Sequence, residues 1–371
     1  MNSAPAEYLM PGGSASITAL PKVSLHDHLD GGLRPQTVID LAAEIGYELP
    51  TTNAESLRQW FIDQSMSGSL VEFLKSFAIT GAVMQTPAQL HRVAREFVVD
   101  LALDGVIYGE VRWAPEQHLE GGLSLDEAVD AVQSGLLAGV EEAAANGHDI
   151  RVGQLITAMR HADRGQEIAE LAVRHRGNGV VGFDIAGAEA GFLPSKFAES
   201  FAYLARHYLP ATVHAGEADG LMSIESALFD GRALRLGHGV RLADDILVTS
   251  EDDEAAYVTL GPIAQWVKDR EITLEVCPTS NLMTEAAGTT ELADHPFDLL
   301  YQLGFRVTVS PDNRLMTGMS LSAELSQLVD TFGYDLTDLE VFQLNAAASA
   351  FLSIDDREEL ADRISAGFEK A

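Results

Sequence analysis

Two short motifs place histidines and a carboxylate at spacings that are compatible with metal binding and acid–base catalysis. His26 and His28 stand at i and i+2, so on an extended chain both imidazole rings point to the same side. His214 precedes Glu217 by three residues, with Gly216 between them. This pattern favours a metal site beside a general acid or base. The plain alternative for the second motif is a buried histidine next to a glutamate that begins a helix.

Two further segments offer groups of the same kind. His238 lies between two glycines, where it could be a metal ligand, a general acid or base, or part of a turn. Asp312 and Asn313 follow a Ser-Pro pair, a composition that is also typical of a turn. The functional alternative is a carboxylate ligand followed by an amide that reads one edge of a substrate.

Eight short apolar runs rich in β-forming residues predict the strands that position these motifs. Between most of them lie stretches with helical apolar spacing, such as Leu125–Ala145. Strand–helix alternation indicates a parallel sheet, and eight such units predict an α/β fold of the (β/α)₈ TIM-barrel type. The predicted strands are Lys22–Leu29, Val106–Trp113, Arg151–Met159, Val180–Ala186, Ala211–Ala215, Ala233–His238, Ile272–Cys277 and Arg306–Ser310.

The four motifs fall at the ends of the first, fifth, sixth and eighth predicted strands, which meet at one face of a barrel. Three imidazoles with one carboxylate suit Zn²⁺, and a site that leaves a position for water is catalytic. A nearby glutamate that is not a ligand would then supply a general acid or base.

The chain is expected to form a single barrel domain over residues 1–371, because no linker divides it. Residues 30–105 are far more than one helix needs, and this helical insertion after the first strand is expected to cover the barrel mouth as a lid. Residues 1–20 are predicted to be a loose leader, and the helical stretch Asp355–Ala366 to cap the barrel.

The amino-acid composition excludes some classes of binding partner and indicates the cellular compartment. With 24 Lys and Arg against 56 Asp and Glu among 371 residues, the net charge is −32. Such a surface repels phosphate backbones and anionic lipids, so neither a nucleic acid nor a membrane is expected as a partner. One cysteine, Cys277, excludes an intrachain disulfide and a Cys-rich zinc site. No secretory signal or membrane-length apolar run is visible, so we expect a cytoplasmic protein.

Six motifs in this order, KVSLHDHLDG, VVGFDIAGAE, TVHAGE, LGHGVRL, CPTSN and SPDN, resemble the adenosine deaminase family of the amidohydrolase superfamily. The resemblance runs from Lys22 to beyond Arg314. It implies a (β/α)₈ barrel with one zinc ion per chain. It also implies hydrolytic deamination of small-molecule substrates, adenosine and 2′-deoxyadenosine, to inosine and deoxyinosine plus ammonia.

Position by position, the resemblance assigns roles around the metal. Glu217 matches the acid that protonates purine N1, and His238 matches the residue that orients the attacking water. The implied metal ligands are His26, His28, His214 and Asp312.

The resemblance also implies substrate contacts. Asp30 matches the group that binds a ribose hydroxyl, Gly187 the backbone donor to a purine nitrogen, and His28 and Asn313 lie beside them. Two departures concern the last strand: the family usually has a second aspartate where Asn313 stands, and Asn-Thr where Ser310-Pro311 stands. An amide can still hydrogen-bond a purine but cannot act as an acid, and proline removes a backbone donor.

Apolar residues of the insertion are candidates for lining the substrate pocket. Leu70, Phe73, Leu74 and Phe77 recur at i, i+3, i+4 and i+7, which predicts one face of a helix that resembles the family's gate helix. The alternative is a helix that buries this face in the core. Met159 at the end of the third strand could also line the mouth, and Ser280 could support a ligand from behind.

Other functions remain open. A sibling aminohydrolase could act on adenine, on AMP or on an adenine-bearing metabolite such as aminofutalosine. Asp30 in HLDG favours a ribose-bearing substrate, since relatives that act on adenine tend to read HLEG, and the acidic composition offers little for a phosphate. Phosphoester or lactone hydrolysis is the wider amidohydrolase alternative. Binuclear members of that superfamily often need a carboxylated lysine on the fourth strand, and the fourth predicted strand has no lysine. A zinc-binding scaffold without activity is disfavoured because every expected ligand and Glu217 are present.

Overall fold

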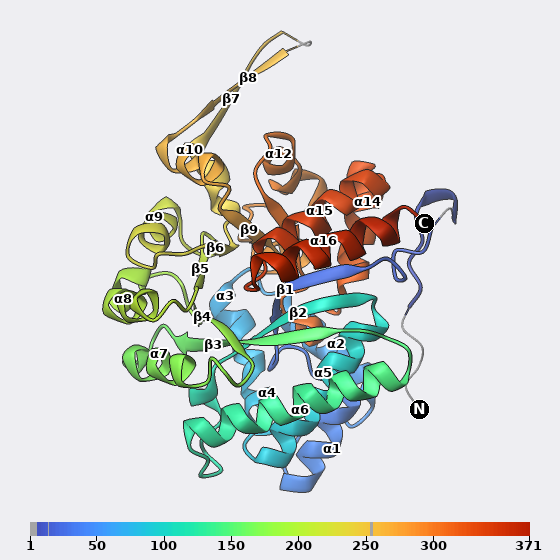
Figure 1. The fold of residues 1–371 in the computed structure, drawn as a ribbon, viewed down its shortest axis with the longest axis vertical. Coiled ribbons are helices and arrows are strands. Elements are labelled where there is room, and N and C mark those ends of the chain that lie inside the picture. Colours follow the sequence, from blue (N-terminus) through green and yellow to red (C-terminus); the bar gives the residue numbers. More distant parts are fainter. Residues whose placement is uncertain (1–5, 14, 253–254) are drawn as a thin grey trace.

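Eight parallel strands form a closed barrel in the computed structural model, which describes residues 6–13, 15–252 and 255–371 (Figure 1). Two parallel four-stranded sheets, β1-β2-β3-β4 and β5-β6-β9-β10, are joined by bridges between Asp27 and Asp312 and between Phe183 and Ala211. The predicted (β/α)₈ barrel is therefore confirmed. The strands are β1 (Lys22–His28), β2 (Val106–Trp113), β3 (Arg151–Met159), β4 (Val180–Ala186), β5 (Thr212–Ala215), β6 (Arg235–His238), β9 (Thr273–Val276) and β10 (Val307–Val309).

Helices surround the strands and pack on their outer side (Figure 1). Several begin at caps that the sequence supplies: Thr86 and Gln89 form a capping box before α5, and Ser124 and Glu127 form another before α6. The surrounding helices are α5 (Pro87–Leu103), α6 (Leu125–Ala145), α7 (Gly165–Arg174), α8 (Ala198–Arg206), α9 (Leu221–Phe229), α10 (Pro262–Asp269), α11 (Pro278–Met283), α12 (Phe297–Gln302), α13 (Arg314–Thr317), α14 (Leu321–Phe332), α15 (Leu336–Ser349) and α16 (Ile354–Phe368).

The long connection between β1 and β2 contains α1 (Pro35–Ile45), α2 (Ala54–Ser65), α3 (Leu70–Phe73) and α4 (Phe77–Ala82) before α5. The continuous helix predicted through residues 70–77 is wrong, because a 3₁₀ turn at Leu74–Ser76 separates α3 from α4. The hydroxyl of Ser76 donates to the carbonyl of Phe73 at 2.8 Å, a local bond that competes with regular helix geometry.

An antiparallel hairpin of β7 (Ile246–Asp252) and β8 (Ala255–Leu260) lies between β6 and α10 and projects away from the barrel (Figure 1). The sequence analysis did not predict this hairpin, which adds two strands outside the barrel. None of the helices in the described residues is long and apolar enough to cross a membrane.

The segment before β1 is not a loose leader over residues 15–20, so that expectation is wrong. Ile17 and Leu20 are buried in the core. The ammonium of Lys22, also buried, donates to the carbonyls of Ile17, Thr18 and Leu20 at 2.7–3.1 Å. Apolar burial and these three bonds hold the segment against the barrel.

Candidate metal centre and active site

Three histidines and one aspartate from three strand ends form a buried cluster at the barrel mouth. One ligand atom from each lies within 4.8 Å of the others: His26, His28, His214 and Asp312. The Oδ1 atom of Asp312 lies 3.3 Å from Nε2 of both His26 and His28, and Nε2 of His28 lies 3.3 Å from Nε2 of His214. The four side chains that the sequence pattern implied as ligands therefore converge.

The donor set fits a zinc ion. Zinc prefers imidazole nitrogen and carboxylate oxygen at about 2.0–2.2 Å, and ligands of a tetrahedral site at that distance lie about 3.3–3.5 Å from one another. The three 3.3 Å separations in this cluster match that spacing. The four side chains could therefore hold a metal ion without a large rearrangement.

The backbone is strained where two of the site residues leave their strands. His238 has φ = 63° and Asp312 has φ = 60°, both in the left-handed region that side chains other than glycine seldom adopt. Gly237 packs against the cluster, because a Cβ atom there would lie 3.0 Å from His214 Cα and 3.1 Å from His26 Cε1. Such geometry persists only where the surrounding structure enforces it, as at functional sites.

Buried carboxylates orient two of the imidazole rings from behind. Nδ1 of His26 lies 3.0 Å from Glu275, and Nδ1 of His214 lies 2.8 Å from Asp184. These contacts leave Nε2 of each ring facing the cluster, the arrangement by which carboxylates orient metal-binding histidines. The hydroxyl of Ser280 donates to Asp312 at 2.6 Å and supports that ligand in the same way.

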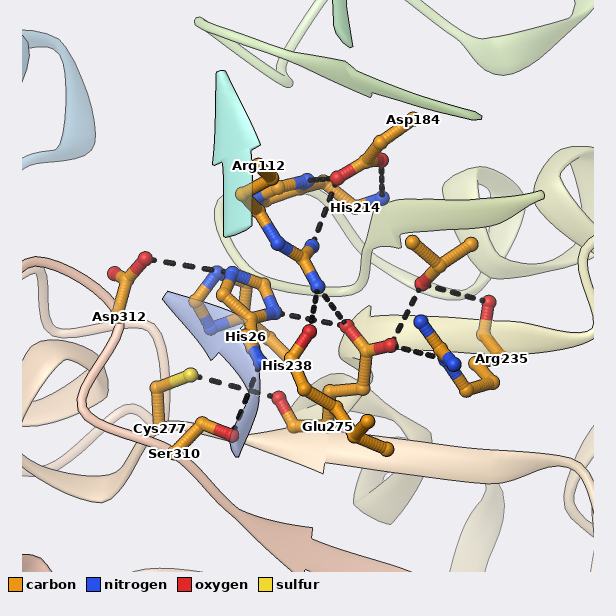
Figure 2. Close-up of polar contacts among 12 residues, drawn as sticks. His26, Arg112, Asp184, His214, Arg235, His238, Glu275, Cys277, Ser310 and Asp312 are labelled. Carbon is orange, nitrogen blue, oxygen red and sulfur yellow. Dashed lines mark hydrogen bonds and ion pairs between the residues drawn. The ribbon is translucent and has the colours of Figure 1, made fainter. Parts of the chain in front are cut away.

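Two buried arginines link these carboxylates across the barrel interior (Figure 2). Arg112 donates to Asp184 at 2.8 Å and to Glu275 at 2.7 Å, and Arg235 donates to Glu275 and Glu110. Burial alone would raise the pKa of Asp184, but its contact with His214 and the charge of Arg112 hold this pKa at about 2. The network thus presents permanent negative charge to the histidines.

The protonation of the histidines suits metal binding. Burial lowers the pKa of His28 well below its usual range and lowers the pKa of His214, so both are neutral imidazoles at neutral pH. The pKa of His26 is raised, because its hydrogen bonds to Asp312 and Glu275 outweigh burial and the charge of Arg112. A metal bound at this site would therefore compete with a proton at His26.

Glu217 and His238 lie together beside the cluster. The Oε2 atom of Glu217 is 3.5 Å from Nε2 of His238, whose Nδ1 lies 3.0 Å from the amide nitrogen of Asn281. Burial, followed by the charges of Asp312 and Glu189, raises the pKa of Glu217 well above its usual range. This shift favours the protonated carboxyl of Glu217, which is the form that can donate a proton.

A cavity of about 690 Å³ opens onto the cluster and contains every residue expected to touch a substrate. Asp30, Gly187 and Asn313 line it beside His28, Glu217 and His238. The apolar wall comes from the insertion and from the end of β3: Leu70, Phe73, Leu74, Phe77 and Met159. The broken helix still turns all four insertion residues toward this cavity.

Asn313 lies at the cavity wall. Its Oδ1 atom is buried without a hydrogen-bond partner and lies against Gly31, where an added Cβ would fall only 2.0 Å away. Pro311, which has no N–H, contributes its carbonyl to the turn by accepting from the backbone N–H of Asn313 at 2.8 Å.

Sequence reasoning missed the supporting residues. Arg112, Asp184 and Glu275 each interrupt an apolar strand with a charged side chain that the fold buries completely. A buried charge is costly unless it is paired, so a charged residue inside a predicted barrel strand is the signal that would have found them.

Comparison with known proteins agrees with this geometry. The family model described as adenosine deaminase matches residues 21–367. The chain is 55% identical to adenosine deaminase 1 of Streptomyces coelicolor, covering 92% of this chain and 85% of that protein. It is 52% identical to the adenosine deaminase of Mycobacterium marinum, covering 94% and 95%. Among solved structures, the adenine deaminase of Arthrobacter aurescens matches with a TM-score of 0.81 at 25% identity, covering 95% of this chain and all of that one.

Proposed function

The chain belongs to the adenosine deaminase family, and we therefore propose that it hydrolyses adenosine and 2′-deoxyadenosine to inosine and deoxyinosine plus ammonia. One observation carries the proposal: the buried carboxyl of Glu217, the ring of His238 and a three-histidine, one-aspartate cluster face the same cavity of about 690 Å³. That combination supplies a proton donor and a site for an activated water to one bound base.

We assign one zinc ion per chain to His26, His28, His214 and Asp312, on the strength of their donor atoms and spacing. When bound, zinc supplies a Lewis acid that makes water nucleophilic near neutral pH. The buried carboxylates Glu275 and Asp184 keep the Nε2 atoms of His26 and His214 free for that role.

Glu217 supports the reaction as the acid. It donates its proton to purine N1, which draws electrons from C6 and makes that carbon electrophilic. A water oxygen then bonds to C6, and the bond from C6 to the amino nitrogen breaks. Of the two protons of the water, one returns Glu217 to its acid form and the other leaves with the amino group as ammonia, so atoms and charge balance.

His238 supports the orientation of the water. Burial lowers the pKa of His238 well below its usual range, so the ring is neutral. Because the amide nitrogen of Asn281 donates to Nδ1, the ring proton sits on Nε2, which faces Glu217 and the cavity. This N–H can hold the attacking water in place opposite C6.

The remaining cavity residues support binding of the nucleoside. The carboxylate of Asp30 can accept from a ribose hydroxyl, the backbone N–H of Gly187 can donate to a purine nitrogen, and the amide of Asn313 can donate to another. His28 would lie beside the base, where the cavity meets the cluster of metal ligands. Gly187 has φ = 99°, which brings its backbone close to the ligand without steric cost.

The cavity favours a nucleoside over a nucleotide. Among the described residues that line it, Lys75 is the one lysine or arginine, and its ammonium is paired with Glu72 at 2.5 Å. A phosphate would call for free cations at this position.

With one buried cysteine, Cys277, and a small-molecule substrate, we propose that the enzyme acts in the cytoplasm.

We assign the helical insertion at residues 30–105 the role of a lid within one barrel domain spanning residues 1–371. The apolar side chains of Leu70, Phe73, Leu74 and Phe77 line the cavity and would exclude water from the base. Exclusion of bulk water strengthens the hydrogen bonds from Glu217 and Asn313.

The test uses purified, zinc-loaded protein. Adenosine, 2′-deoxyadenosine, adenine and AMP are supplied separately, and the loss of the adenine chromophore is followed by ultraviolet absorbance. We expect turnover of the two nucleosides and little of AMP or adenine. Turnover of adenine alone would contradict the assignment of Asp30 to ribose binding. Turnover of AMP would contradict the inference that Lys75, paired with Glu72, does not bind a phosphate.

A further inference from the structure

Glu189 forms an unusually complete set of hydrogen bonds in the loop after β4. It lies two residues beyond Gly187, and its side chain is buried. One carboxylate accepts from four successive backbone N–H groups and one hydroxyl: Gly216 (2.7 Å), Glu217 (3.0 Å), Ala218 (2.6 Å), Asp219 (3.1 Å) and Ser223 Oγ (2.6 Å).

The turn at residues 216–219 depends on this acceptor. Gly216, with φ = 72°, starts the turn, and α9 begins only at Leu221, so these N–H groups point inward as a concave anion-binding backbone. Gly216 and Glu217 are buried. Without the carboxylate of Glu189, their N–H groups would be left without an acceptor, and the turn would rearrange to satisfy them.

The side chain of Glu217 is held less firmly than its backbone. Its carboxyl oxygens lie 3.5 Å from Thr284 Oγ1 and 3.5 Å from His238 Nε2, both long for hydrogen bonds. The backbone N–H of Glu217, by contrast, donates to Glu189 at 3.0 Å within a fully bonded turn. The position of the acidic group is therefore set mainly by the turn.

We propose that Glu189 is a positioning residue of the deamination reaction: it fixes the turn at residues 216–219 so that the Glu217 carboxyl meets the purine nitrogen. Glu189 shares its loop with Gly187, so the same bonds hold the β4 and β5 loops at a fixed separation. The backbone N–H of Gly187 and the carboxyl of Glu217 can then contact the same purine ring. This inference rests on the proposed role of Glu217.

Three variants of the zinc-loaded enzyme test it. In Glu189→Ala all five bonds are lost, and we expect kcat for adenosine to fall about 100-fold with a much smaller change in KM, since a displacement of about 1 Å costs about that much. Glu189→Gln keeps one oxygen, which can still accept from Glu217, Ala218 and Asp219, so most of kcat should return. Ser223→Ala removes only the hydroxyl donor and should leave kcat within about twofold, well short of the displacement effect.

Two readouts separate positioning from a general structural defect. Hydrogen exchange should accelerate at the amides of residues 216–219 in Glu189→Ala while the barrel strands keep their protection. In a Glu217→Gln background, adding Glu189→Ala should lower the residual kcat no further, because the positioned acid is already absent.

The outcomes are distinguishable from failure of the proposed function. If the wild-type protein does not deaminate adenosine, the proposed function fails, while the exchange measurement still reports on the turn. Unchanged kcat in Glu189→Ala despite faster exchange at residues 216–219 would overturn the inference, and so would an additive loss in the double variant. If Glu189→Ala fails to fold, Glu189→Asp, whose shorter side chain cannot reach all donors, replaces it with the same expectations.

Discussion

Replacing Glu275 by glutamine tests whether the buried charge network supports the metal ligands. The Glu275 carboxylate contacts four donors: His26 Nδ1 (3.0 Å), Arg112 Nη2 (2.7 Å), Arg235 Nε (2.5 Å) and Thr212 Oγ1 (3.0 Å). Each oxygen serves two of them. Whichever way the new amide turns, its NH₂ group faces two donors, and the negative charge is lost.

Removing one partner of a buried ion pair costs about 3–5 kcal/mol. We expect the lower end, about 3 kcal/mol, because Arg112 keeps Asp184 and Arg235 keeps Glu110. With about 2.1 cal/mol/K of unfolding entropy per residue, a chain of 371 residues should lose about 4 °C of Tm. Zinc affinity should fall about 10- to 100-fold, since His26 loses the carboxylate that orients it.

Thermal unfolding of the metal-free proteins gives the change in Tm, and competition with a chromophoric chelator gives zinc affinity. Glu271→Gln is the matched control, because that carboxylate is largely exposed and pairs with Arg306 at the surface. It should change stability by less than about 1 kcal/mol and leave zinc affinity unchanged. If Glu275→Gln binds zinc as tightly as the wild type, the network does not support the ligands and the reasoning is refuted.

Three further predictions concern packing, the cavity wall and pH. Gly237→Ala would place a Cβ 3.0 Å from His214 and 3.1 Å from His26, and we expect about tenfold weaker zinc binding by chelator competition; unchanged affinity would show that the ligands can shift freely. Phe73→Ala removes a buried wall of the cavity and should raise KM for adenosine about tenfold in steady-state assays, with a smaller effect on kcat. Burial lowers the pKa of His295 to about 4. The unfolded chain therefore binds a proton at this residue below pH ~6.5, whereas the folded chain does not bind it until the pH approaches ~4. His295 should therefore contribute about 3 kcal/mol to the fall in the free energy of unfolding between pH ~6.5 and ~4, measured by denaturant titration, and His295→Gln should lack that part of the decline.

The barrel could be predicted because its strands are short apolar runs separated by helices with a clear period. The ends of β5, β6, β9 and β10 were placed one or two residues too far out, since bonding between neighbouring strands, rather than composition, sets where a strand ends. The hairpin of β7 and β8 was missed because it stands apart from the barrel and obeys no βα alternation.

The metal-ligating residues could be predicted because each stands at a strand end, where the barrel topology gathers them. The supporting network could not, because its pairs are distant in the chain: Arg112 and Glu275 are 163 residues apart. The 3₁₀ turn at Leu74–Ser76 separates α3 from α4, and a pattern of apolar spacing does not reveal such a local change of helix type.

The most direct test of the proposed deamination compares the wild type with Glu217→Gln at equal, measured zinc content. Inosine and ammonia are quantified together after incubation with adenosine. We expect equal amounts of both products from the wild type and a loss of at least about 100-fold in Glu217→Gln, because the amide cannot protonate purine N1. Wild-type protein that carries one zinc ion and yields neither product, or a Glu217→Gln variant that retains full activity, would contradict this proposal.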